Sequence, residues 1–84
     1  MSNGMARLID IEKGMQVKIA SIEGEPRYMT RLNQSGLYPG DLARVVRIAP
    51  FDGPVLIEVR RMEIALGKSL AARILVELAA CDSL

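Results

Sequence analysis

The sequence predicts a mainly β fold, a small five-stranded barrel with one short inserted α-helix. Short runs of alternating apolar and polar residues recur along the chain, and turn signals rich in Gly and Pro separate them. Only one segment, between the first and second of these runs, has helical periodicity. The chain has 84 residues, which is enough for one domain but too few to fill two stacked sheets. A small barrel therefore fits these features best.

The first clear strand is predicted over residues 15–23. Val17 and Ile19 lie on one face because strand residues two apart point the same way. Ile22 falls on the opposite parity, which indicates a bulge near Ser21.

A short helix is predicted to follow this strand. Pro26 suits the first helical position, where its missing N–H costs nothing. Tyr28 and Met29 share one face with Leu32, at spacings of four and three residues. Gly36 ends the helix, since glycine reaches positive φ without a Cβ clash.

The segment after the helix is a predicted structural turn formed by Gly36, Pro39 and Gly40. Proline fixes its own φ, and Pro-Gly fits the two central positions of a type II turn, the second of which needs positive φ. The expected order is that the helix stops, Leu37 is buried, the chain turns sharply and a strand begins.

Four further strands complete the predicted barrel, at residues 42–49, 55–60, 64–66 and 74–78. Periodicity leaves open which face of the second strand points inward, although Ala43 with Val45 is the simpler choice. A tight reversal around Arg60 and Arg61 must join the third and fourth strands. Residues 67–73 are long enough for a single helical turn.

The predicted domain covers residues 8–78, between a loose tail at 1–7 and a second tail at 79–84. Its core should contain the inward residues of the strands and the apolar face of the helix. These residues are Leu8, Val17, Ile19, Leu32, Leu37, Val45, Ile57, Val59, Ile64, Leu66, Ile74 and Val76. A barrel would also remove most of the exposed sheet edge, which otherwise invites pairing with other chains.

The composition excludes several classes of function. Eleven basic and ten acidic residues leave a net charge of +1, without the basic surplus of a nucleic-acid binder. No apolar run has membrane-spanning length, and the first residues lack the layout of a signal peptide. We therefore expect a cytoplasmic protein with no nucleic-acid partner and no membrane insertion. The sequence leaves the oligomeric state open, a homo-oligomer included.

Catalysis is not expected. The chain has no histidine, so none of its serines has the usual activating base. Glutamate pairs such as Glu58 and Glu63 are typical of a solvated surface. Gly36 and Gly40 lack the Lys-Ser/Thr that would follow in a phosphate-binding loop. We expect neither an enzyme nor a cofactor.

A tight metal site is also not expected in the monomer. Only Glu77, Cys81 and Asp82 bring metal-ligating residue types together in the sequence. Cys81 is the only cysteine, and a free thiol near a chain end is the simpler interpretation. Met15, Met29 and Met62 are better interpreted as core fillers than as soft-metal ligands.

A series of short motifs runs in order along the chain from about Leu8 to Val76. The most specific is the Gly-Leu-x-Pro-Gly turn at residues 36–40, and the pattern Ile64-Ala65-Leu66 adds independent weight. The other members are Leu8, Gly14, Val17, Ile19, Ile22, Arg31-Leu32, the segment 49–54, Ile57, Val59, Arg60, Ala71 or Ala72, Ile74 and Val76. In this order and spacing they resemble the FeoA family, the small cytoplasmic companions of the bacterial ferrous-iron permease FeoB.

The resemblance implies an SH3-like β-barrel with a short inserted helix, in agreement with the five strands inferred from periodicity. It also implies a role in FeoB-dependent uptake of ferrous iron, through contact with the cytoplasmic part of FeoB. The same barrel resembles the C-terminal domain of iron- and manganese-dependent repressors. The family supplies no catalytic motif to carry over, and Gln34-Ser35 departs from the small or apolar pair that is more usual there.

Three functions stay open at this level. The first is an accessory binding module for an iron permease. The second is a metal-sensing regulatory domain, which the absence of histidine disfavours. The third is a general protein-interaction barrel without a link to iron.

Two loops stiffened by proline are the predicted partner-binding surface. One presents Tyr38 and the other Phe51, with Arg60 and Arg61 as polar neighbours in the facing hairpin. An aromatic ring on a rigid loop loses little entropy on binding and can anchor an interface. The alternative is that both rings fold back and cap the ends of the barrel.

Overall fold

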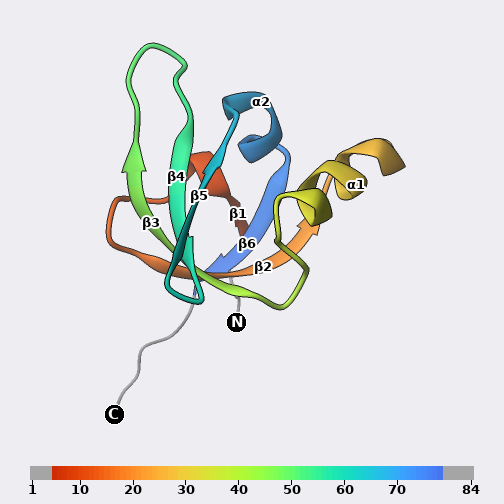
Figure 1. The fold of residues 1–84 in the computed structure, drawn as a ribbon, viewed down its shortest axis with the longest axis horizontal. Coiled ribbons are helices and arrows are strands. Elements are labelled where there is room, and N and C mark those ends of the chain that lie inside the picture. Colours follow the sequence, from red (N-terminus) through yellow and green to blue (C-terminus); the bar gives the residue numbers. More distant parts are fainter. Residues whose placement is uncertain (1–4, 79–84) are drawn as a thin grey trace.

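The computed structural model describes residues 5–78 as one six-stranded antiparallel sheet with two short α-helices and a 3₁₀ turn (Figure 1). The strand order in the sheet is β1-β6-β2-β3-β4-β5. The strands are β1 (Met5–Arg7), β2 (Gln16–Ile22), β3 (Leu42–Ile48), β4 (Val55–Val59), β5 (Met62–Leu66) and β6 (Ile74–Leu78). The helical elements are η1 (Leu8–Asp10), α1 (Pro26–Gln34) and α2 (Lys68–Ala71).

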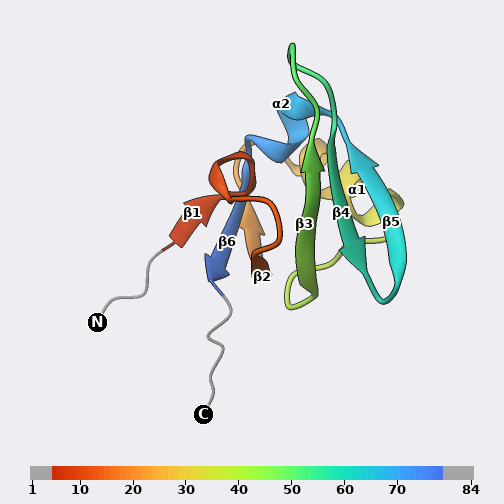
Figure 2. The same ribbon diagram turned by 90° about the vertical axis from the view of Figure 1, so that its left-hand side faces the viewer.

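The sheet curls into a barrel-like shape but does not close (Figures 1 and 2). Within residues 5–78, β1 and β5 lie at the two ends of the strand order, so each keeps one edge without a strand partner. The mainly β fold class is confirmed, with six strands in place of five. Complete closure, which would have left no such edges, is not reached.

The sixth strand comes from residues 5–7, which the sequence assigned to a loose tail. Met5 pairs with Glu77 and Ala6 with Val76, so β1 extends the sheet beyond β6. Three residues are too few for a detectable alternation, which is why the sequence gives no sign of this strand. Residues 1–4 and 79–84 lie outside the described residues, and the tails predicted there stay predictions.

The Arg7 side chain ties β1 to its surroundings. Its guanidinium donates to the Glu23 carboxylate at 2.6 Å and to the Ala72 carbonyl oxygen at 3.0 Å. The hydrogen bond and the charge of Glu23 raise the pKa of Arg7 further above neutrality. These contacts fasten the N-terminal strand to the segments just after β2 and α2.

The remaining strands match the predicted positions closely. The bulge predicted near Ser21 is present as a shift of register in β2 between Ile19 and Ser21. Ala43 and Val45 are both buried, which settles the inward face of β3. The structure adds a second irregularity, between Val45 and Arg47 in the pairing of β3 with β4.

The helix α1 ends as predicted at Gly36, which has a φ of +97°. The Gly36 N–H donates to the Asn33 carbonyl at 2.9 Å, and the Leu37 N–H donates to the Leu32 carbonyl at 3.2 Å. This pair of bonds defines a Schellman motif. Leu32 and Leu37 are both fully buried, so the end of the helix is anchored in the core.

One hydrophobic core fills the inside of the curled sheet. Its members within the described residues are Leu8, Ile11, Val17, Ile19, Leu32, Leu37, Ala43, Val45, Val55, Ile57, Val59, Leu66, Leu70, Ala71, Ile74 and Val76. The predicted core is confirmed except at Ile64, which is only partly buried and packs against this core. The predicted set lacked Ile11, Leu70 and Ala71, which lie outside the alternating runs, and also Ala43 on β3 and Val55 on β4. The expectation that Met15 and Met62 fill the core is wrong, because they are exposed by 42% and 57%.

Between residues 5 and 78, no helix combines the length and the apolar character needed to cross a membrane.

Candidate partner-binding site

The turn after α1 has the predicted type II geometry. The Asp41 N–H donates to the Tyr38 carbonyl oxygen at 3.0 Å, which leaves Pro39 and Gly40 at the two central positions. Gly40 has a φ of +99°, the value that the second central position of this turn requires. The Gly40 N–H also donates to the Ile19 carbonyl at 2.7 Å, which fixes the turn against β2.

The Asp41 carboxylate joins this turn to the β4–β5 hairpin. One oxygen accepts a hydrogen bond from the Tyr38 N–H at 2.9 Å, and the other pairs with the Arg60 guanidinium at 2.9 Å. Arg60 also donates to the Gly36 carbonyl at 2.9 Å, where the negative end of the α1 dipole favours a cation. The Asp41 side chain is only 18% exposed, and each of its two oxygens has a hydrogen-bond partner within the protein.

The β4–β5 reversal consists of Arg60 and Arg61 alone. Val59 pairs with Met62, so the loop has two residues, and their φ values are 52° and 68°. Positive φ at both positions is the type I′ geometry, which favours Asn-Gly. A non-glycine residue in this region costs about 1–3 kcal/mol. Asn or Gly would therefore occupy these two positions with less backbone strain than the two arginines do.

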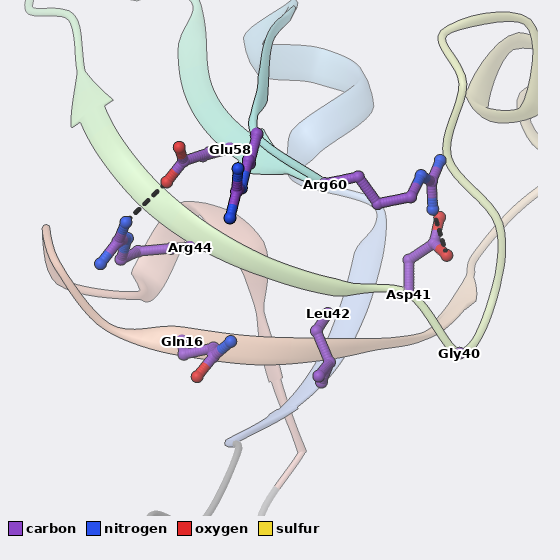
Figure 3. A pocket seen from close by; sticks show the side chains of 8 residues that line it. Gln16, Gly40, Asp41, Leu42, Arg44, Glu58 and Arg60 are labelled. Carbon is purple, nitrogen blue, oxygen red and sulfur yellow. Dashed lines mark hydrogen bonds and ion pairs between the residues drawn. The ribbon is translucent and has the colours of Figure 1, made fainter.

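A groove opens beside this reversal, on the outer face of the sheet (Figure 3). Arg44 on β3 lies opposite Gln16 on β2 and Glu58 on β4, so the three side chains share one face. Arg44 and Glu58 form an ion pair at 2.6 Å. The groove has a volume of about 620 Å³ and is lined by Gln16, Gly40, Asp41, Leu42, Arg44, Glu58, Arg60 and Arg61.

Tyr38 and Phe51 are both exposed, by 51% and 98% respectively. The alternative that both rings fold back and cap the barrel is therefore wrong. Tyr38 and Arg60 lie at one end of the molecule, where both are bonded to Asp41, and Arg61 follows Arg60 in the same reversal. Phe51 lies at the tip of the β3–β4 hairpin, at the other end of β4 (Figure 1). The four predicted residues thus form two separate surfaces, and the arginines neighbour Tyr38 only.

The Phe51 hairpin is a second strained tip. Phe51 and Asp52 have φ values of 58° and 62°, and the Gly53 N–H donates to the Pro50 carbonyl at 3.1 Å, which closes the turn. Asp52 pairs with Lys68 of α2 at 2.7 Å. The tip is therefore tethered to the body of the protein while its ring projects into solvent.

Comparison with known proteins identifies the family of this fold and turn. The family model for the FeoA domain matches residues 6–78, which is most of the chain. The chain belongs to the FeoA family. An iron uptake regulatory protein (FeoA) of known crystal structure has 30% sequence identity to this chain. The two structures superpose with a TM-score of 0.79 over 88% of this chain and 97% of that one. A FeoA-like protein from Clostridium acetobutylicum is 25% identical, with a TM-score of 0.81 over 100% of this chain and 96% of that one.

The same architecture occurs in a larger protein. A manganese-dependent transcriptional repressor superposes with a TM-score of 0.83 over 94% of this chain, which corresponds to 44% of the repressor. The sequence identity is 19%, so this likeness shows the fold alone. The SH3-like β fold implied by the sequence resemblance is confirmed for this FeoA-family chain.

The sequence did not predict several of the groove residues of this FeoA-family chain. Asp41, Arg44 and Glu58 are ordinary surface charges in the sequence, and only the register of β3 against β4 brings two of them together. Asp41 directly follows the Pro-Gly turn, which was its one local signal.

Metal-ligating side chains do not gather in the described part of the chain. Across residues 5–78, no group of three or more His, Cys, Asp or Glu side chains is placed to hold a metal ion. Of the three residues that the sequence brought forward, Cys81 and Asp82 lie outside the described residues.

The Asp52–Lys68 pair predicts a measurable titration. The hydrogen bond from Lys68, followed by its charge, lowers the pKa of Asp52 below the ordinary value. A lowered folded-state pKa means that the pair stabilises the fold above the unfolded pKa of about 3.9, and that this contribution is lost as the pH falls through the folded value. We expect carboxyl-detected NMR to show the lowered pKa in the parent protein and a return toward the ordinary value in Lys68→Met.

The matched control is Arg47→Met, which removes a cation of β3 that forms no ion pair with Asp52 among residues 5–78. An Asp52 pKa that is the same in the parent and in Lys68→Met would contradict the pairing.

Proposed function

We propose that this FeoA-family protein is a cytoplasmic accessory factor of ferrous iron uptake that binds the cytoplasmic part of an FeoB-type permease. The FeoA domain implies a role in ferrous iron transport. The observation that carries the proposed binding is the rigid presentation of Tyr38 beside Arg60 and Arg61.

Rigidity matters because an interface loses less entropy when its anchors are already ordered. The Tyr38 N–H and carbonyl are both bonded to Asp41, and Pro39 limits the backbone further. The ring is half exposed on this fixed turn. Tyrosine and arginine are also enriched among the residues that dominate binding energy.

Phe51 is proposed as a second and separate contact. A single compact partner surface would have to extend past the length of β4 to reach both rings, because Tyr38 and Phe51 lie at opposite ends of that strand (Figure 1). The Tyr38 end is therefore the primary contact in this proposal, and the two rings are tested individually.

The experiment measures capture of the cytosolic portion of FeoB by the purified protein. We expect Tyr38→Ala to weaken binding more than about fivefold, since loss of an interface anchor costs more than about 1 kcal/mol. Phe51→Ala should weaken it to a similar or smaller extent. The melting temperature of both variants should stay close to that of the parent, because neither ring is part of the core.

Met15→Ala serves as the control, because Met15 is an exposed apolar residue outside both surfaces. If Tyr38→Ala and Phe51→Ala both remain folded and bind FeoB with unaltered affinity, the proposed surface is the wrong one.

A further inference from the structure

The groove beside the Arg60–Arg61 reversal has the chemistry of a site for a peptide. We infer that it holds an extended acidic segment of a protein partner, with a carboxylate bound by Arg61 and an apolar side chain packed against Leu42. This inference rests on the proposed function, since the permease is the partner proposed for this end of the molecule. It adds the chemical class of the segment that is recognised.

One of the three arginines that line the groove has no ion-pair partner among residues 5–78. Arg44 is paired with Glu58 at 2.6 Å, and Arg60 is paired with Asp41 at 2.9 Å (Figure 3). Arg61 lines the same groove, and within residues 5–78 it takes part in none of the ion pairs or side-chain hydrogen bonds. The guanidinium fork of arginine matches a carboxylate in two parallel hydrogen bonds. An acidic ligand is therefore the complement that the groove lacks.

The backbone at Arg61 supports a role for its side chain. Its φ of 68° belongs to a turn position that glycine or asparagine would fill at lower cost. Arg60 shares the strain, but its contacts to Asp41 and Gly36 explain its presence. Arg61 has no such internal explanation among the described residues. Strained backbone that local packing does not account for is a pointer to function.

The size and lining of the groove favour a peptide over a small ion. Leu42 is 52% exposed and lines the groove together with the polar side chain of Gln16. Gly40 lines the groove without a side chain, and the space beside its Cα is open, because a Cβ there would meet nothing within 4 Å. A volume of about 620 Å³ accommodates several side chains, far more than a single anion needs.

The experiment uses Arg61→Gly, a variant that should not suffer from misfolding. Glycine suits a φ of 68°, so removal of the guanidinium also relieves the strain, and the melting temperature should stay the same or rise. The probes are short overlapping peptides that cover the cytosolic portion of an FeoB-type permease, measured by fluorescence anisotropy. We expect the tightest peptides to be rich in Asp and Glu, and their affinity to fall more than about fivefold in Arg61→Gly.

Two further variants separate charge from structure. Arg61→Glu should weaken acidic peptides more than Arg61→Gly does, and Arg61→Lys should retain part of the affinity because it keeps the charge without the fork. Arg47→Ala, an exposed arginine of β3 that does not line the groove, should bind like the parent. Raised salt should weaken the parent complex more than the Arg61→Gly complex.

Three outcomes would overturn the inference. One is unchanged binding of acidic peptides by Arg61→Gly, and another is a preference for basic or neutral peptides. The third is that inorganic phosphate shifts the NMR signals of Arg61 while no peptide binds, which would make the groove a simple anion site.

A separate experiment, capture of the intact cytosolic portion of FeoB, tests the proposed function. If the parent and Arg61→Gly capture it equally, the inference fails and the proposed function stands. If acidic peptides bind through Arg61 but intact FeoB is not captured, the inference stands and the proposed function fails.

Discussion

Ile57→Ala is expected to lower the free energy of unfolding by about 2–5 kcal/mol, the range for truncating a buried Ile or Leu. Ile57 has no exposed surface and lies at the centre of β4. It pairs with Val45 of β3 on one side and with Ile64 of β5 on the other, so the lost methyl groups leave a cavity inside the sheet. Chemical denaturation of the parent and the variant measures the difference.

The matched control for this prediction is Ile48→Ala. Ile48 is the same residue type on the neighbouring strand β3, but 42% of it is exposed, so its truncation should cost much less. For a domain of this size, each kcal/mol corresponds to about 4–8 °C in melting temperature. Equal losses for the two variants would show that Ile57 is not part of a well-packed core.

Gly40→Val is expected to be the second large effect, at about 1–3 kcal/mol. The cost comes from backbone conformation, because φ is +99° and a Cβ at Gly40 would meet nothing within 4 Å. The change should also reduce capture of FeoB, since the turn that Gly40 completes positions Tyr38 and Asp41. Thermal denaturation and the FeoB binding assay measure the two consequences.

Gly67→Val is the control that separates strain from bulk. A Cβ at Gly67 also meets nothing within 4 Å, but its φ of −58° is ordinary for any residue. We expect a cost below about 1 kcal/mol, chiefly from a poorer N-cap for the short helix α2. If Gly67→Val destabilised the protein as much as Gly40→Val, the positive φ of the turn would not be the cause.

Strained backbone in this protein gathers at two hairpin tips. The non-glycine residues with positive φ among residues 5–78 are Phe51 and Asp52 at one tip and Arg60 and Arg61 at the other. Asp52 and Arg60 are held by ion pairs to the body of the domain, which helps to maintain each tip. The neighbours of these two, Phe51 and Arg61, are exposed as well, and they are the side chains that we propose to contact a partner.

Local patterns in the sequence were sufficient for most of the secondary structure. Alternation placed the strands from β2 to β6, and the glycine at position 36 placed the end of α1. The type II turn followed from Pro39-Gly40 in the same way. These features depend on residues that are close in the chain, because φ preferences and side-chain period act over a few residues. The ordered series of motifs that includes this turn also pointed to the FeoA family, which the family model confirms.

The tertiary structure alone decided what brings distant residues together. The β1–β6 pairing joins residues about seventy positions apart. Because β1 has only three residues, it has no periodicity from which the sequence could predict this pairing. The bonds of Arg60 to Asp41 and of Arg44 to Glu58 likewise depend on which strands are neighbours and in what register. Tyr38 and Phe51 looked alike in the sequence, each an aromatic residue beside a proline. Their separation was decided by the course of β4, because a strand carries its two ends to opposite sides of a small domain.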